Sequence, residues 1–188
     1  MFSIRTIILS GVATGISQQP WGLGWIAWFS IIPFIFEIQK ICSFKDHLKL
    51  GFIWGFFYNI TILFWIAQNL GTNLFIGIIS MLSAVILFSF NILIIMGIYY
   101  SIRIKIGKYG YLLLPVIWVC VEYIRSFGVL ANPWVSLANS QIDYLTLIQN
   151  VEYTGIYGIS FWIVFINLLG YEWLRNMNKK SAFSWLFI

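Results

Sequence analysis

The residues whose types and spacing could do chemistry lie within the stretch 109–134. An apolar run, YGYLLLPVIWVCV, leads into Glu122-x-x-Arg125 and then into Asn132-Pro133-Trp134. A charged side chain where hydrocarbon meets headgroup is costly unless it is paired or in use, so this pattern marks a candidate functional site. Glu122 and Arg125 are three residues apart and share one helix face, where they can pair locally. A purely structural pair that reaches toward the interface is the alternative interpretation.

Composition and hydropathy indicate which elements position these residues. Hydrophobic residues make up 61% of the chain and charged residues 9%, with a mean hydropathy of +0.89, whereas a soluble domain has about 25% charged residues. A spanning helix needs about 20 mainly apolar residues, and the apolar runs lack the alternation of strands. We therefore predict an all-α integral membrane protein with a single transmembrane domain over residues 1–188, six spanning helices and the start of a truncated seventh. The helices are expected at about 4–17, 21–38, 50–68, 74–102, 109–125 and 156–174, with the seventh beginning in 181–188.

Lysine and arginine residues orient these helices, because cytoplasmic loops are enriched in them. Ten of the eleven basic residues precede the first helix, lie in the loops after the second and fourth, or follow the sixth. The N-terminus and the loop around His47 are therefore predicted to face the cytoplasm, and residues 126–155 the opposite side. Arg125 is the one basic residue predicted at the outer face. The net charge of +5 reflects this topology and gives no indication of nucleic-acid binding.

Other residues in the predicted helices have both structural and functional interpretations. A tryptophan stripe in the second helix is typical of an aromatic belt and packing surface, or of a groove that contacts lipid. Amides inside the third, fourth and sixth helices bond across helices or line a polar path. The fourth helix is so long that it must tilt, kink near Gly97 or protrude. The tryptophans are Trp21, Trp25 and Trp28, and the amides are Asn59, Asn91 and Asn167.

The sequence does not predict a conventional catalytic or metal-binding constellation. His47, the single histidine, lies among charged residues in a predicted cytoplasmic loop, where a solvated side chain is expected. A serine hydrolase within the membrane would therefore have no histidine base. Cys42, Cys120 and His47 do not have the spacing of a zinc site, so no metal is expected and no cofactor either.

The N-terminal run has two interpretations. Arg5, followed by an apolar run that ends at Gly15-Ile16-Ser17, resembles a secretory signal peptide. We favour an uncleaved first helix, because Gly11-x-x-x-Gly15 provides a face for close packing. Gly51-x-x-x-Gly55 has the same spacing in the third predicted helix.

Several short motifs, taken in order, resemble the N-terminal membrane half of the apolipoprotein N-acyltransferase family. The motifs are Pro20-Trp21-Gly22-Leu23-Gly24-Trp25-Ile26-Ala27-Trp28, Gly51-Phe52-Ile53-Trp54-Gly55-Phe56, Glu122-Tyr123-Ile124-Arg125, Pro133-Trp134, Gln141 and Gly155-Ile156-Tyr157-Gly158-Ile159-Ser160-Phe161. They extend over nearly the whole chain. The chain departs from the family pattern at Ala131-Asn132, where Gly-Phe is usual, and at Asn139, where glycine is usual.

The resemblance implies a bacterial inner-membrane protein with several spans. Members of the family move an acyl chain from a phospholipid, through a cysteine thioester, to the N-terminal amine of a diacylglyceryl-cysteine lipoprotein. By resemblance, Arg125 handles the phospholipid headgroup and Trp134 lies at the lipid entry, while Glu122 and Pro133 give structural support. An ordinary interfacial tryptophan is the alternative interpretation of Trp134.

The resemblance also implies which parts the reaction needs in addition. The Glu-Lys-Cys triad of the family belongs to a periplasmic nitrilase-like domain that follows the membrane helices, and no residue of this chain matches the triad. We therefore expect the chain alone to be inactive, with a separately encoded nitrilase-like domain as a candidate partner beside membrane lipids, the phospholipid donor and the lipoprotein acceptor. The alternatives are a truncated, inactive remnant and a small lipid-binding or transport protein of shared ancestry.

Overall fold

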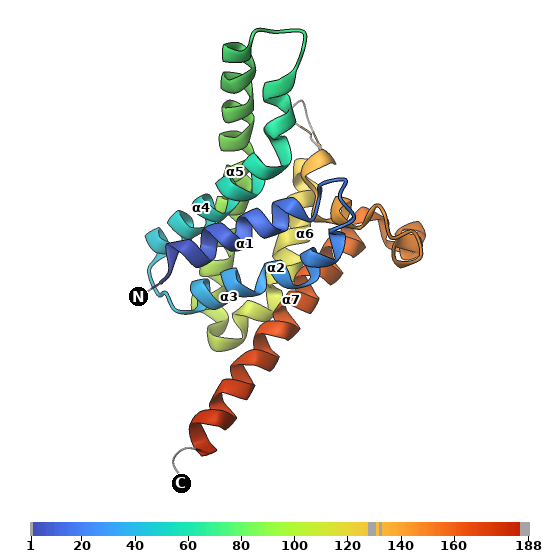
Figure 1. The fold of residues 1–188 in the computed structure, drawn as a ribbon. Coiled ribbons are helices and arrows are strands. Elements are labelled where there is room, and N and C mark those ends of the chain that lie inside the picture. The colour runs from blue at the N-terminus through green and yellow to red at the C-terminus, as the bar shows by residue number, and fades with distance from the viewer. Residues whose placement is uncertain (1, 128–130, 132, 185–188) are drawn as a thin grey trace.

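The computed structural model describes residues 2–127, 131 and 133–184, without the side chains of Lys108, Pro133 and residues 178–184. Every regular element in this part of the chain is a helix, as predicted, and it contains no strand (Figure 1). The α-helices are α1 (Ile4–Ile16), α2 (Ala27–Ser30), α3 (Ile32–Gln39), α4 (Phe44–Leu63), α5 (Leu74–Ile106), α6 (Leu114–Arg125) and α7 (Val151–Ser184). Short 3-10 helices are η1 (Gly24–Ile26), η2 (Phe64–Gln68), η3 (Gly107–Leu113), η4 (Pro133–Val135), η5 (Leu137–Gln141) and η6 (Leu147–Asn150).

Three segments are long and apolar enough to cross a membrane. They are Phe44–Gln68, Leu74–Ile106 and Leu147–Met177, which correspond to the third, fourth and sixth predicted spans. The other three predicted spans are shorter helices within the described residues. Helix α1 has 13 residues and α6 has 12, and the segment Gly24–Gln39 is divided between η1, α2 and α3. Length therefore supports three of the six predicted spans.

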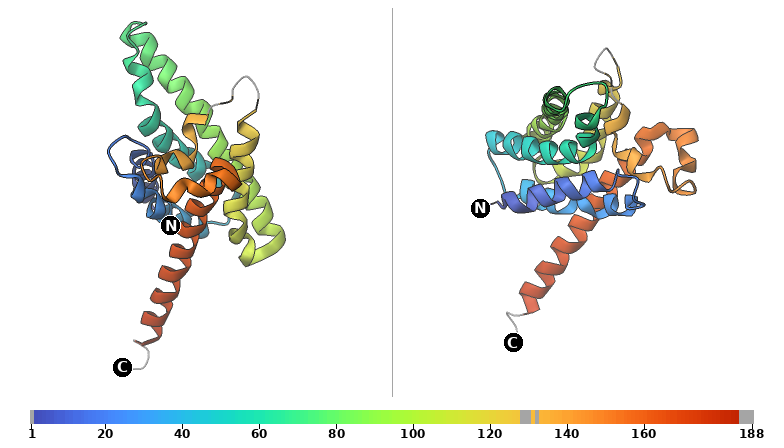
Figure 2. Two further views of the ribbon diagram at one scale, coloured as in Figure 1. Left: turned by 90° about the vertical axis from the view of Figure 1, so that its right-hand side faces the viewer. Right: turned by 45° about the horizontal axis from the view of Figure 1, so that its top comes forward.

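The α4–α5 hairpin is the longest part of the fold. Helix α4 begins at Phe44, so the charged residues 45–49 belong to a helix and not to the predicted loop. Helix α5 continues through Gly97 without a break. Its 33 residues give a length of about 50 Å at about 1.5 Å per residue. The hairpin protrudes from the rest of the bundle, which is one of the three outcomes predicted for so long a helix (Figures 1 and 2).

Small residues bring α1, α4 and α5 close together, as the glycine spacing predicts. A Cβ atom at Gly11 of α1 would lie 2.7 Å from the carbonyl oxygen of Trp54 in α4. One at Gly15 of α1 would lie 2.5 Å from Cβ of Thr61, which is also in α4. On another face of α4, a Cβ atom at Gly51 would lie 2.5 Å from Cγ of Met96. Larger residues would push these helices apart, and close backbone approach is what holds helices together in lipid.

The second predicted span is not one helix. It begins at Gly24 and breaks at Ile31, between α2 and α3. Asn167 of α7 bonds to both sides of this break. Its Oδ1 accepts hydrogen bonds from the amides of Ile31 and Ile32 at 2.9 and 3.1 Å, and its Nδ2 donates to the Ala27 carbonyl at 2.8 Å. The predicted role of Asn167 in bonding across helices is confirmed.

The break also changes the environment of the three tryptophans. Trp21 lies before η1, the first helical turn of this segment, so the three tryptophans do not form a single stripe on one helix. Trp21 and Trp25 are 59% and 53% exposed. Trp28 instead turns inward, where its indole donates to Oε1 of Gln141 at 3.0 Å.

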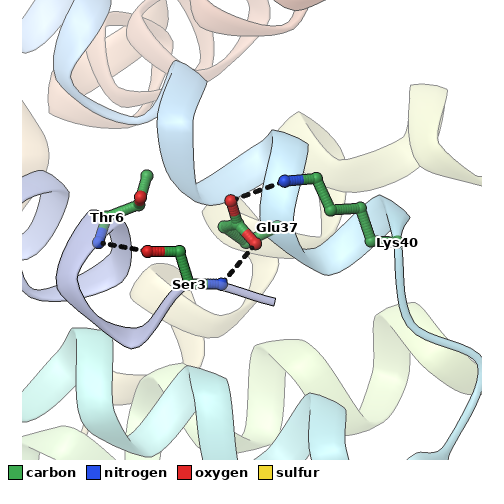
Figure 3. A network of polar contacts seen from close by, with 4 residues as sticks. All are labelled: Ser3, Thr6, Glu37 and Lys40. Atoms are coloured by element: carbon green, nitrogen blue, oxygen red, sulfur yellow. Dashed lines mark hydrogen bonds and ion pairs between the residues drawn. The ribbon is translucent and has the colours of Figure 1, made fainter. Parts of the chain in front are cut away.

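Glu37 joins the start of α1 to the end of α3 (Figure 3). Its buried carboxylate accepts a hydrogen bond from the Ser3 amide at 2.9 Å and forms an ion pair with Lys40 at 2.7 Å. The Ser3 hydroxyl in turn caps α1 by accepting a hydrogen bond from the Thr6 amide. The positions of these two helix ends are therefore coupled.

Helix α7 contains a break near its start and extends beyond its predicted end. Gly155 has a φ of 63°, a left-handed conformation that favours glycine. Residues 181–184 continue α7 and do not begin another helix, and the remaining part of the predicted seventh helix, 185–188, lies outside the described residues. The C-terminal half of α7 leaves the bundle at the end opposite the α4–α5 hairpin (Figure 2).

Candidate functional site

Glu122 of α6 holds the segment that follows this helix. Its side chain is 6% exposed. One carboxylate oxygen accepts hydrogen bonds from the indole of Trp118 at 3.2 Å and from the Leu137 amide at 3.0 Å. The other oxygen accepts a hydrogen bond from the Ser136 hydroxyl at 3.1 Å. Three donors converge on one carboxylate, which fixes where η5 begins.

Ser160 of α7 holds the same segment from a second helix. Its hydroxyl accepts a hydrogen bond from the Ala138 amide at 3.2 Å and lies 3.2 Å from the Ser136 hydroxyl. Because Ser136 donates its single proton to Glu122, Ser160 must be the donor in the contact between the two hydroxyls. The result is a buried chain of hydrogen bonds that runs from α7 through η5 to α6.

Gln141 anchors the far end of the same segment. Its side chain is fully buried, and its Oε1 accepts the hydrogen bond from Trp28. Its Nε2 donates to the Gly24 carbonyl at 2.8 Å and to the Ser140 hydroxyl at 2.9 Å. Gly24 approaches the backbone of Ser140 so closely that a Cβ atom there would collide with it. The segment 133–141, hereafter the anchored segment, is thus attached to α6, α7 and η1.

The motifs behind the family resemblance meet at the anchored segment. Gly24, Glu122, Gln141 and Ser160 come from four of those motifs and are far apart in the sequence. Glu122 and Ser160 bond to this segment, Gln141 belongs to it, and Gly24 approaches it closely. Sequence reasoning placed these four residues in the pattern but did not predict that they would meet, and it gave Ser136 no role in the site.

Trp134 projects from the anchored segment toward the end of α4. Its side chain is 61% exposed, and its ring lies 5.8 Å from the ring of Trp65 in η2 at an angle of 70°. The neighbouring Val135 is held by its carbonyl, which accepts a hydrogen bond from the Tyr58 hydroxyl at 3.3 Å. Pro133 begins η4 just before Trp134, while Asn132 lies outside the described residues. Two exposed indoles therefore adjoin at this end of α4.

Arg125 and Glu122 share a helix face and could pair locally, but they do not form an ion pair. In the described part of the chain, the ion pairs are Lys40–Glu37 and Arg175–Glu172. The alternative of a structural pair is not realised, because Glu122 is already occupied by donors from the anchored segment, which spacing along one helix cannot reveal. Arg125 faces α5 instead, where it lines a groove and a small cavity.

The groove runs between α5 and α6 and has a volume of about 240 Å³. Its lining is apolar except for Asn91 and Arg125, and the apolar residues are Leu87, Phe88, Ile94, Ile98, Val121, Ile124 and Phe127. Ile94 and Ile98 are 48% and 41% exposed, so the groove opens to the surroundings of the helices. A long apolar slot with one guanidinium and one amide has the lining that a lipid with an anionic headgroup requires.

A cavity of about 10 Å³ adjoins the groove and shares Asn91 and Arg125 with it. Asn59, which is 1% exposed, also lines the cavity, and its Oδ1 has no hydrogen-bond partner among the described residues. This volume matches about one water molecule, which would satisfy the buried oxygen. Asn59 lies about 15 Å along α4 from Lys49, at about 1.5 Å per residue. Arg125, which lines the same cavity, therefore lies beside the apolar part of α4.

A second groove lies on the other side of the anchored segment. It has a volume of about 200 Å³ and lies between α2, η6 and α7. Trp28 and Gln141 line it together with Trp162 and Ile166. Trp28 thus combines both interpretations of the tryptophan pattern, because it bonds within the fold and also borders a groove.

This geometry defines a class of protein, namely an all-helical protein with long apolar helices and one anchored segment beside an apolar groove. The family description "Apolipoprotein N-acyltransferase N-terminal domain" matches residues 10–169. The chain therefore belongs to this family.

The curated relatives that this chain resembles include several apolipoprotein N-acyltransferases. An apolipoprotein N-acyltransferase of Geobacter metallireducens is 32% identical over 93% of this chain and 34% of its own length. Apolipoprotein N-acyltransferases of Chlorobaculum tepidum and Thermotoga maritima are 27% and 26% identical over 93% and 100% of this chain, and over 32% and 39% of their own lengths. The chain thus spans about a third of the length of these relatives.

Proposed function

We propose that this chain acts as the membrane domain of an apolipoprotein N-acyltransferase in the bacterial inner membrane. In this proposal it presents a phospholipid acyl donor to a nitrilase-like domain, which forms the thioester and passes the acyl chain to the diacylglyceryl-cysteine of a lipoprotein. Family membership supports the reaction class, since the matched region covers most of the chain. The residues that perform the transfer itself are not assigned to this chain.

The observation that carries the lipid-binding part of the proposal is the position of Arg125. A guanidinium without a carboxylate partner among the described residues faces an apolar groove of about 240 Å³. Guanidinium binds phosphate through two parallel hydrogen bonds, which an amine cannot reproduce. The proposed arrangement places the phosphate at Arg125 and one acyl chain along the groove toward Ile98, with Trp134 and Trp65 flanking the entry.

We expect Arg125→Ala to weaken phospholipid binding about tenfold, the effect of losing hydrogen bonds to a charged group. Arg125→Lys should lose less, because it keeps the charge but not the forked donors. The measurement is photo-crosslinking of the purified chain to a phospholipid that carries its reactive group in the headgroup. Arg5→Ala is the matched control, since Arg5 is an exposed arginine in the first turn of α1. Equal crosslinking of Arg125→Ala, Arg5→Ala and the unmodified chain would contradict the proposed site.

The proposed orientation places residues 40–49 in the cytoplasm and residues 126–155 outside. Cys42 is exposed and provides a native probe of the first region, and Leu145, 72% exposed, can be replaced by cysteine to probe the second. In a Cys120→Ala background, we expect Cys42 of intact spheroplasts to react with an impermeant maleimide only after permeabilisation. Leu145→Cys, with Cys42 also replaced by alanine, should react without permeabilisation. The reverse pattern would overturn the orientation.

A further inference from the structure

Another pocket, separate from the two grooves and the small cavity, lies at the end of α4 and α5 that is opposite the anchored segment. It has a volume of about 360 Å³ and lies where the end of α3 meets α4 and α5. Its lining is partly apolar and partly cationic, and consists of Ile41, Cys42, His47, Tyr100, Arg103, Ile104 and Gly107. None of these residues belongs to the site around Arg125.

Arg103 is held rigidly at this pocket. Its guanidinium donates to the carbonyls of Ile38 and Ile41 at 3.1 Å and to that of Gln39 at 3.2 Å. These carbonyls come from the last turn of α3 and the residues just after it, so Arg103 caps the C-terminal end of this helix. Three of the five guanidinium N–H groups bond to these carbonyls, which leaves two for other acceptors.

His47 supports Arg103 from α4. It is fully buried, so the prediction of a solvated histidine was wrong, because α4 begins before it and turns it inward. Its Nδ1 lies 2.9 Å from the Ser43 carbonyl and must donate to it, which leaves Nε2 as an acceptor facing Arg103 at 3.5 Å. The histidine and the three carbonyls therefore orient the guanidinium but place no carboxylate on it.

The charges around the pocket do not neutralise Arg103. Glu37 is nearby in the chain but is already paired with Lys40 (Figure 3). Asp46 lies in the first turn of α4, where it complements the helix dipole. Within residues 37–107, five basic residues outnumber the two acids, Glu37 and Asp46; the basic residues are Lys40, Lys45, Lys49, Arg103 and Lys105.

From this geometry we propose that the pocket binds the phosphate of an anionic membrane phospholipid. Arg103 supplies the fixed cation, and the exposed side chain of Ile104 borders the acyl chains. Basic pockets between helices at a charged membrane surface select such headgroups. The preset orientation of Arg103 limits the entropy lost on binding. This site is separate from the proposed acyl-donor site, because Arg103 lies 12 residues along α5 from Asn91, which is about 18 Å at about 1.5 Å per residue.

Cys42 allows a direct test, because it is exposed and lines the pocket. In the full chain with Cys120→Ala, the rate of Cys42 alkylation by maleimide is measured in detergent micelles with added phosphatidylglycerol, with phosphatidylcholine or with inorganic phosphate. We expect phosphatidylglycerol to slow alkylation at least fivefold, the effect of one favourable basic contact. Phosphatidylcholine has no net negative charge, and inorganic phosphate has no acyl chain to contact the apolar lining, so each should slow alkylation less than about twofold.

Two substitutions, at residues of similar exposure, distinguish binding in the pocket from binding to the surface around it. Ile104→Trp fills the pocket, whereas Ile106→Trp adds the same side chain to a neighbouring residue that does not line it. The ratio of rates with and without phosphatidylglycerol should fall toward one in Ile104→Trp and stay unchanged in Ile106→Trp. Equal protection by both phospholipids, protection by inorganic phosphate alone, or an unchanged ratio in Ile104→Trp would each overturn the proposal. Arg103→Ala is not the primary test, because it also removes the cap of α3.

Discussion

Replacing Asn167 by leucine is expected to destabilise the fold more than any other single change to an amide in these helices. Asn167 uses all four of its hydrogen-bonding positions: two backbone amides at the break before α3, the Ala27 carbonyl, and the Ile163 carbonyl within α7. Leucine would leave the amides of Ile31 and Ile32 without this acceptor. Each buried group left unpaired costs about 1–3 kcal/mol, so we expect a loss of about 2–6 kcal/mol in the free energy of unfolding.

The measurement is unfolding of the purified chain in mixed micelles by increasing amounts of denaturing detergent. Asn91→Leu is the matched control, because Asn91 also lies inside a long apolar helix but has no hydrogen bond to any of the described residues. Its substitution should change the free energy of unfolding by less than about 1 kcal/mol, as for surface changes generally. If the two leucine variants were equally stable, Asn167 would not be what holds the interrupted helix to α7.

The long helices were predictable from the sequence because their signal is local. Hydropathy located the third, fourth and sixth spans, and lipid leaves few alternatives to a helix for such runs. The glycine spacings in α1 and α4 also predicted close contacts, since a missing side chain has its effect wherever the neighbouring helix approaches. Each of these inferences needs only the residues of one helix.

The prediction of the second span as one helix failed because it rested on hydropathy alone. Pro33, in the first turn of α3, is a local sign that a new helix begins there, but hydropathy does not show where the preceding helix ends or what stabilises the break. At the break, Asn167, more than 130 residues later, bonds to the backbone amides of Ile31 and Ile32. An asparagine inside an apolar helix signals that it needs polar partners, but not which ones.

The candidate site was only partly predictable for the same reason. Sequence spacing identified Glu122 and Arg125 but joined them to each other, because that was the one contact the helix itself could supply. The structure assigns Glu122 to the anchored segment and leaves Arg125 facing the groove between α5 and α6. The lesson is specific: a charged pair three residues apart need not be an ion pair where loop donors compete for the acid.

This division of roles predicts opposite outcomes for two substitutions at Glu122. Glu122→Ala removes the acceptor for Trp118, Ser136 and Leu137. Bonds to a charged acceptor contribute about 1.5–3 kcal/mol each, so we expect a loss of about 3 kcal/mol or more and release of the anchored segment.

Glu122→Gln should be tolerated, because the amide of glutamine can reproduce the network. Its Oε1 can keep the hydrogen bonds from Trp118 and Leu137, and its Nε2 can donate to the Ser136 hydroxyl, which can reverse its direction. The readout is hydrogen exchange of residues 133–141 together with headgroup crosslinking of the same samples. We expect fast exchange and reduced crosslinking in Glu122→Ala, and near-normal values for both in Glu122→Gln. If the charge of Glu122 served Arg125 instead, glutamine would impair crosslinking as much as alanine does while exchange of the segment stayed slow.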